Sequence, residues 1–281
     1  SDAQDVIVGN MERRLTADAA VRTQRLDFAL GLRPACRRRA MSVQLHERNQ
    51  PTLRTILCRR RTAAPLHPLR SDDRRLLSQA DGIYITGGDQ KRLLATIGGT
   101  PIETALREAL RERGACIGGT SAGASAMSEH MLAMGPSRSL PEKGAASLAA
   151  GLGFLKHVVI DQHFSERQRL GRLLSVIAQN PGLIGVGIDE DTALVIAADR
   201  SLEVVGAGAV TILDGRRMVS SFLDAALHER LEILNLTLHL LPAGCSYRLA
   251  SSAGAPGEHD AVPEPLRDIL WTMTSIDNED R

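Results

Sequence analysis

The chain has 281 residues, of which 43% are hydrophobic, so it can bury a large core. It contains no apolar run of the roughly 18 residues that span a membrane, and we predict a cytoplasmic protein. Acidic residues near the start argue against a signal peptide, and the four scattered cysteines are expected to be free thiols rather than metal ligands or disulfides. Residues 1–75 hold 16 arginines and 8 acidic residues, but an aromatic content of 2% leaves few rings for base stacking, so we predict a solvated basic surface and no nucleic-acid partner.

The first 75 residues contain few apolar runs long enough for a buried strand. V-I-V-G at 6–9 is the exception, and it could form an edge strand or the first strand of a sheet. No other element is predicted before residue 76.

From residue 76 onward, strand and helix patterns alternate. Strands are predicted at 83–86, 115–117, 157–160, 184–188 and 193–197, and helices at 90–97, 102–113, 122–131 and 166–179. Later, 202–205 and 210–213 resemble a hairpin closed by Asp214-Gly215, and alternating leucines at 234–240 indicate a half-buried strand. This order predicts an α/β fold with a doubly wound, mainly parallel sheet and an antiparallel C-terminal extension. Residues 1–250 would form one domain, and 251–281 a linker with a short helix carrying Trp271.

The stretch G-T-S-A-G at 119–123 is the strongest candidate for chemistry. It lies between an apolar strand and a helix pattern, which is typical of the elbow that exposes a nucleophilic serine, here Ser121. The backbone N–H of Ala122 would then face a developing oxyanion. The alternative is a small-residue helix packed closely on a sheet.

A serine nucleophile needs a base and an orienting carboxylate. His163 follows the apolar strand that ends in D-Q, and Glu190 follows the next one, so both lie where parallel strands meet ligands. Asp189 and Asp191 are alternatives for the acid. The chain order Ser, His, acid differs from the Ser, acid, His order of α/β-hydrolases and matches the class I glutamine amidotransferase-like fold.

Five motifs follow one another along the chain. They are G-G-D-Q at 87–90, G-T-S-A-G-A at 119–124, S-E-H-M at 128–131, D-Q-H-F with three following arginines at 161–172 and G-I-D-E-D-T-A at 187–193. Together, in this order, they resemble the cyanophycinase family. The resemblance covers about residues 76–250. It implies a serine peptidase that cuts cyanophycin, a poly-aspartate with an arginine on each β-carboxyl, into β-Asp-Arg dipeptides. It also implies Ser121, His163 and Glu190 as the catalytic triad, with no metal or other cofactor.

By the same resemblance, the substrate pocket would be lined by Gln90, Asp161, Gln162, Arg167, Arg169 and Arg172. The oxyanion would rest on backbone N–H groups of Ala122 and of the Gly88-Asp89 turn. The arginines could bind substrate carboxylates with two parallel hydrogen bonds, and Asp161 could pair with a substrate guanidinium. On this interpretation Arg172→Lys weakens cleavage of the polymer but not of an uncharged ester.

The first 75 residues depart from the family, whose second apolar strand is not found here. A reading-frame error over roughly residues 10–60 or divergence toward a binding protein would account for this. Two alternatives to the polymer hydrolase therefore follow: a dipeptidase for aspartyl peptides on the same fold, and an inactive relative that acts as a binding module. The expected partner is cyanophycin or an aspartyl peptide, and a homodimer is compatible with the sequence.

Overall fold

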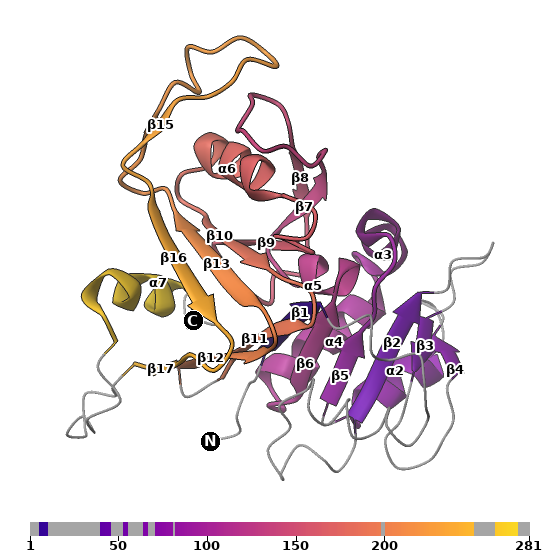
Figure 1. Cartoon of the computed structure of the whole chain (residues 1–281). Helices are drawn as coiled ribbons and strands as arrows, with labels where there is room; N and C mark the ends of the chain where they lie inside the picture. The colour runs from indigo at the N-terminus through magenta and orange to yellow at the C-terminus, as the bar shows by residue number, and fades with distance from the viewer. Residues whose placement is uncertain are drawn as a thin grey trace.

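The strands of the computed structural model form two main sheets that share one core (Figure 1). The structure describes residues 6–10, 40–45, 53–55, 64–66, 71–80, 82–197, 200–249 and 262–274. The larger sheet contains, in spatial order, β17 (Ser246–Arg248), β12 (Ser201–Gly206), β11 (Thr192–Ile196), β1 (Val6–Asn10), β6 (Cys116–Thr120), β5 (Gly82–Ile85), β2 (Ala40–Leu45), β3 (Leu53–Thr55) and β4 (Ala64–Leu66). The smaller sheet contains β16 (Thr237–Pro242), β13 (Ala209–Asp214), β10 (Ile184–Ile188) and β9 (Val158–Gln162).

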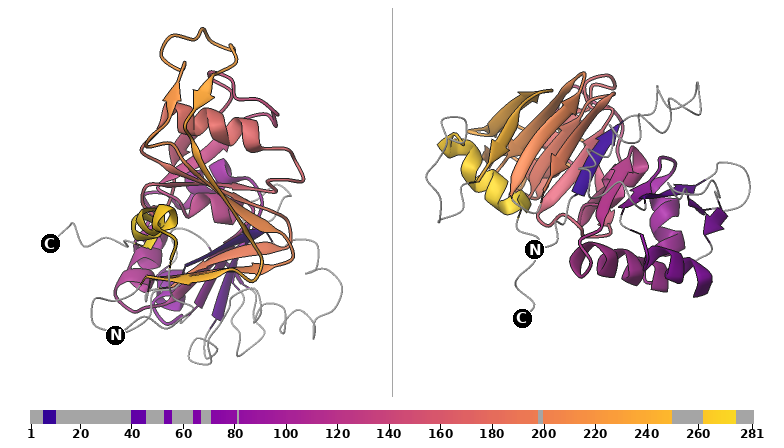
Figure 2. Two further views of the ribbon diagram at one scale, coloured as in Figure 1. Left: turned by 60° about the vertical axis from the view of Figure 1, so that its left-hand side comes forward. Right: turned by 90° about the horizontal axis from the view of Figure 1, so that it is seen from below.

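Two short ribbons and a set of helices complete the described structure. The ribbons pair β7 (His130–Met134) with β8 (Ser147–Ala150), and β14 (Val219–Ser220) with β15 (Ile233–Leu234). The β14–β15 ribbon projects from the body of the protein beyond β13 and β16 (Figure 2). The helices are α2 (Ser71–Leu77), α3 (Gln90–Ile97), α4 (Pro101–Arg111), α5 (Ala122–Ala126), α6 (Leu170–Gln179) and α7 (Glu264–Thr274). None of these described helices has both the length and the apolar character needed to cross a membrane.

The α/β class is confirmed. The sequence predicted a mainly parallel sheet, but the two sheets of the structure mix parallel and antiparallel strands. Parallel pairing joins β2, β5, β6 and β1 in the larger sheet, and β9 with β10 in the smaller one. Beyond them β11, β12 and β17 are antiparallel, as are β13 and β16. Residues 197–200, between β11 and β12, are too few for a parallel crossover, which needs a dozen or more residues. The glutamine amidotransferase-like topology stays a prediction.

The predicted hairpin of residues 202–205 and 210–213 is wrong. The two strands exist, as β12 and β13, but β12 pairs with β11 and β17, whereas β13 pairs with β10 and β16. The chain therefore passes from one sheet to the other at residues 207–208. Gly206 has φ 119°, a conformation that a side chain would strain, which permits this abrupt change of direction.

The N-terminal part supplies four strands of the larger sheet, β1 to β4, of which the sequence predicted only the first. β1 lies between β6 and β11 and is therefore an interior strand, not an edge. β2 pairs in parallel with β5, so this part of the chain does contain a second strand of the sheet, which the sequence did not predict. Within its sequence, residues 41–45 (M-S-V-Q-L) alternate apolar and polar residues, a signal that is weak over so few residues. The cysteines Cys36 and Cys58 lie outside the described residues, and Cys116 and Cys245 are not joined to each other by a disulfide.

Two predicted helices are shorter than their sequence patterns. α5 ends at Ala126, not at residue 131, because the segment at 151–155 takes the carbonyls at its end: Leu152 N–H donates to Ala126 O at 2.7 Å. His130 and Met131 belong to β7 instead. α6 begins at Leu170, not at residue 166, after a turn in which Gln168 has φ 50°.

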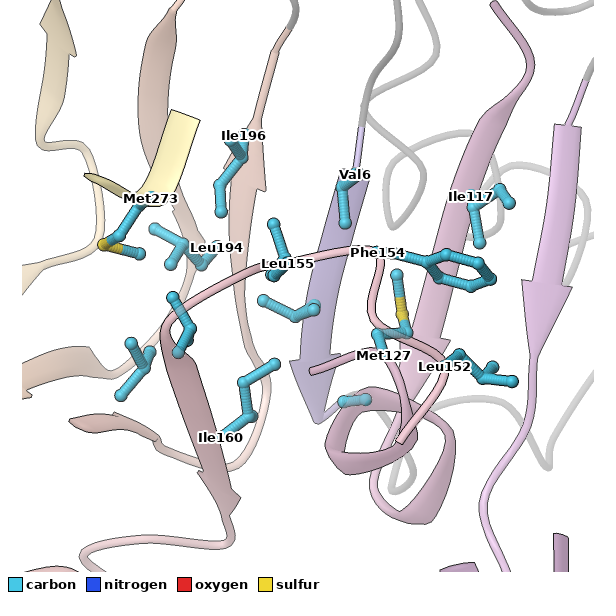
Figure 3. Close-up of a cluster of buried hydrophobic side chains, with 14 of the residues drawn as sticks. Val6, Ile117, Met127, Leu152, Phe154, Leu155, Ile160, Leu194, Ile196 and Met273 are labelled. Atoms are coloured by element: carbon cyan, nitrogen blue, oxygen red, sulfur yellow. The ribbon is translucent and has the colours of Figure 1, made fainter. Parts of the chain in front are cut away.

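The main core lies between the two sheets (Figure 3). Val6 and Ile117 of the larger sheet, Ile160 of the smaller sheet, Phe154 from the intervening loop and Met273 of α7 belong to this one cluster. A second cluster between α6 and the other face of the smaller sheet contains Val159, Leu173, Val176, Ile177 and Leu213. α7 therefore packs onto the same core as the rest of the chain, while most of the predicted linker before it lies outside the described residues.

The leucine alternation at 234–240 is not one strand, because β15 ends at Leu234 and β16 begins at Thr237. Leu236, between them, packs against the second cluster, but the leucines at 238 and 240 face outward. In β16, Leu238 and Leu240 are 50% and 62% exposed, and Leu241 carries the contact with the core. Alternation identifies a strand with two different faces, and it does not say which face meets the core.

Candidate active site

Ser121 stands at a strained turn between β6 and α5. Its φ of 50° lies in the left-handed region that non-glycine residues rarely adopt, and its N–H donates to Gly9 O at 3.1 Å. The flanking glycines are required by close packing. A Cβ on Gly123 would lie 2.2 Å from Ile85 O, and one on Gly119 would lie 2.7 Å from the Gly123 carbonyl. The predicted elbow is therefore present in the structure.

The structure brings Ser121, His163 and Glu190 into one hydrogen-bonded series. Ser121 Oγ lies 3.2 Å from His163 Nε2, and His163 Nδ1 lies 3.0 Å from Glu190 Oε1. The imidazole is almost wholly buried. Asp189 is occupied elsewhere, since its carboxylate accepts hydrogen bonds from Ser165 and from the Ala209 N–H. Of the three acids in the turn, the structure thus places Glu190 against the histidine.

The three residues come from both sheets. Ser121 follows β6 of the larger sheet, while His163 and Glu190 follow β9 and β10, which are parallel neighbours in the smaller sheet. The carboxyl ends of parallel strands lie at the same edge, so the histidine and the acid meet there. A buried hydrogen bond from Ser125 Oγ to Ile160 O, 3.1 Å long, ties α5 to β9 and so holds the serine against the histidine.

Two of the three predicted oxyanion-hole residues lie next to the serine in the chain or share its pocket. Ala122 is the buried first residue of α5, and Gly88 lines the same pocket as Ser121. The Asp89 side chain caps α3 by accepting from the N–H groups of Lys91 and Arg92. The role of the backbone N–H groups of the 88–89 turn as oxyanion donors stays a prediction.

A pocket of about 260 Å³ opens beside Ser121. It is lined by Gly88, Gln90, Ser121, Leu132, Ala133, Met134, Gly135, Gln162, His163, Arg167, Arg169 and Arg172. Five of the six predicted substrate residues are among them. The wall formed by 132–135 was not predicted, because these residues follow the predicted helix of 122–131 and no element was assigned to them. The S-E-H-M motif at 128–131, which directly precedes this wall, was the sequence feature that could have indicated it. Gln90 Nε2 donates to Leu132 O at 3.1 Å and anchors that wall to α3.

Asp161 lies beneath the pocket and not in it. Its side chain is fully buried and accepts from Arg172 Nε at 2.7 Å, from Arg172 Nη2 and from Arg169 Nη1 at 3.3 Å. The carboxylate is thus already paired within the protein, unlike the sequence-based expectation that it meets a substrate guanidinium. Arg172 Nη1 also donates to Gly135 O at 2.7 Å, so Arg172 connects β9 to the pocket wall.

Arg169 differs from Arg172 in its unused donors. Its Nη1 donates to the Gln162 carbonyl and to Asp161, but its buried Nε has no hydrogen-bond partner among the described residues. Burial lowers the pKa of Arg169 to about 10, although the negative charge of Asp161 acts in the opposite direction and raises it. The guanidinium remains a cation at neutral pH. In the described part of the chain no group of three or more His, Cys, Asp or Glu residues could hold a metal ion.

Known proteins share much of this sequence. The chain is 45% identical over 191 residues to a cyanophycinase of Synechococcus elongatus, covering 68% of this chain and 58% of that protein. It is 38% identical over 190 residues to a cyanophycinase of Trichormus variabilis, covering 67% and 64%. A crystal structure of a peptidase from an acI-B1 actinobacterium is similar with a TM-score of 0.44 and 26% identity, covering 63% of this chain and 62% of that one.

The chain spans less than two thirds of the length of these curated relatives. The sequence model of peptidase family S51 matches residues 62–204, just over half of the chain, and that range contains Ser121, His163 and Glu190. This chain therefore belongs to peptidase family S51.

Proposed function

We propose that the chain is a serine-type peptidase that hydrolyses cyanophycin to β-Asp-Arg dipeptides. The observation that carries the proposal is the series Ser121–His163–Glu190, with hydrogen-bond distances of 3.2 and 3.0 Å, at the edge of an arginine-lined pocket. The relatives described as cyanophycinases support the choice of substrate.

In the proposed mechanism, Ser121 Oγ attacks the α-peptide carbonyl between two aspartate units, and its proton passes to His163 Nε2. Glu190 orients the imidazole through Nδ1 and stabilises its positive charge. Backbone N–H groups of Ala122 and of the Gly88-Asp89 turn stabilise the oxyanion. His163 then protonates the leaving amine, and water attacks the acyl-enzyme with His163 as base.

The arginines would take different parts in substrate recognition. Arg169 has a buried N–H without a partner among the described residues, so a substrate carboxylate could accept a hydrogen bond from it. Arg167 lines the pocket and is exposed, which leaves its guanidinium accessible to the polymer. The donors of Arg172 are directed to Asp161 and Gly135, so we assign it to holding the pocket in shape.

The test is to incubate purified protein with insoluble cyanophycin and to detect released β-Asp-Arg by mass spectrometry. We expect release by the parent and none by Ser121→Ala. A matched control is Ser78→Ala, which removes an exposed serine hydroxyl outside the pocket. A serine-directed electrophile should label Ser121 with one equivalent. Full turnover by Ser121→Ala would refute the nucleophile.

The aspartyl dipeptidase and the inactive binding module give distinct outcomes. A dipeptidase would cleave short α-aspartyl peptides and leave the insoluble polymer intact. A binding module would adsorb to the polymer without releasing dipeptide, and Ser121 would not be labelled.

A further inference from the structure

A second and larger cleft lies away from Ser121. Its volume is about 610 Å³, and it is lined by Asp214, Arg216, Arg217, Thr237, Glu264 and Asp268. α7 runs alongside β16 here (Figures 1 and 2). All these residues follow residue 204, where the match to the family model ends.

The cleft is at the opposite end of the smaller sheet from the triad. Asp214 pairs with Ile184 at the start of β10, whereas Glu190 follows Ile188 at the end of that strand. Four residues of strand separate the two ends by about 13 Å. The cleft is therefore a separate feature from the pocket beside Ser121.

Two of its charges neutralise each other. Arg216 donates from Nε to Asp214 Oδ1 at 3.0 Å and from Nη2 to Oδ2 at 2.7 Å. The hydrogen bond to Asp214 raises the pKa of Arg216, and the charge of Asp268 adds to this effect. The Asp268 carboxylate is thus near enough for its charge to act on Arg216.

Three charged side chains of the cleft form no direct contact of opposite charge within the part of the chain that the structure describes, although the charge of Asp268 acts on Arg216 from a distance. The side chains of Glu264, Asp268 and Arg217 make no hydrogen bond or ion pair there. Glu264 and Asp268 are four residues apart on α7, so two like charges share one helix face. A cation bound between them would relieve their repulsion, while Arg217 offers a site for an anion.

We propose that this cleft binds a zwitterion, with its guanidinium on Glu264 and Asp268 and its carboxylate on Arg217. A planar guanidinium can donate to two carboxylates at once, which favours it over an ammonium group. The inference rests on the proposed function, since each repeat of the proposed polymer carries this β-Asp-Arg unit. A second attachment point would raise the effective concentration of an insoluble substrate at the enzyme.

The experiment uses Ser121→Ala, so that no turnover occurs, with and without Glu264→Gln/Asp268→Asn. One arm measures binding of soluble β-Asp-Arg by calorimetry, and the other measures adsorption to insoluble cyanophycin by sedimentation. We expect the added substitutions to weaken binding in one or both arms by roughly tenfold. The matched control is Glu108→Gln/Glu112→Gln, which removes two carboxylates four residues apart at α4.

Loss of adsorption would assign the cleft to the polymer, and loss of dipeptide binding alone would assign it to the released unit. Unchanged binding in both arms would overturn the inference. Arg217→Ala tests the anion side independently and should weaken the same arm. Dipeptide release by the parent is measured separately, so failure of the proposed function is distinguished from failure of the cleft. Circular dichroism checks that the variants fold.

Discussion

Replacing Arg172 tests whether this side chain holds the active site together or binds the substrate. Arg172 is buried and makes two hydrogen bonds to the fully buried Asp161 and one to Gly135 O. Arg172→Met removes all three and leaves the Asp161 carboxylate with Arg169 at 3.3 Å. Arg172→Lys keeps the charge but removes the planar fork, so a single ammonium must replace three donors in different directions.

The expected magnitudes follow from this burial. Removing one partner of a buried ion pair destabilises a protein by about 3–5 kcal/mol, so Arg172→Met should lower the free energy of unfolding by that amount. Arg172→Lys should lower it by about 1.5–3 kcal/mol, the contribution of one charged hydrogen bond. The double variant Asp161→Asn/Arg172→Met should be less destabilised than the sum of the single variants, because each single variant leaves one member of the Asp161–Arg172 pair without the other, although Arg169 still loses its contact with Asp161.

Urea unfolding followed by circular dichroism measures the stability, and turnover is compared on cyanophycin and on an uncharged activated ester. We expect both activities to fall together in Arg172→Lys, because the residue connects β9, which leads to His163, with the pocket wall. Arg167→Lys is the control for stability, since Arg167 is exposed. If Arg172→Lys has normal stability and loses activity on the polymer alone, Arg172 binds substrate and our interpretation is wrong.

Three further predictions concern the acid, the elbow and the acid stability of the protein. Glu190→Gln should lower turnover about 10²- to 10⁴-fold in steady-state assays with little change in stability, whereas a wild-type rate would point to another acid. Gly123→Ala should destabilise the protein by more than about 1 kcal/mol in urea unfolding, because the added Cβ would lie 2.2 Å from Ile85 O, and an unchanged midpoint would contradict this packing. Burial alone would raise the pKa of Asp214, but hydrogen bonds from Arg216 outweigh it, so the pKa lies below its ordinary value of 3.8. The resulting stability is present above pH 3.8 and lost as the pH falls through the folded-state pKa, and Asp214→Asn should flatten this part of the stability profile.

Local patterns in the sequence determined the centre of the site. The elbow at Ser121 was predictable because its glycines and the preceding apolar strand are contiguous in the chain. His163 and Glu190 were predictable because each directly follows an apolar strand. The choice of Glu190 over Asp189 was only implied by family resemblance. In the structure Glu190 lies against His163, whereas Asp189 is turned toward Ser165 and Ala209.

Other features depend on contacts between distant segments, which no local pattern encodes. Whether β1 is an edge strand or an interior one depends on its neighbours, β6 and β11, which are more than one hundred residues away in the chain. The short strands β12 and β13 look like a hairpin in sequence, but their hydrogen bonds go to different sheets.

The role of Asp161 shows the same division between sequence and tertiary structure. Its place beside His163 in the chain indicates a residue near the site, and this much the sequence determined. Only the fold shows that Arg169 and Arg172 satisfy its carboxylate beneath the pocket. Successive side chains of a strand point to opposite faces, so Asp161 and its neighbour Gln162 meet different surroundings. Which of those surroundings is a pocket depends on what packs against the sheet, and that is decided by the tertiary structure.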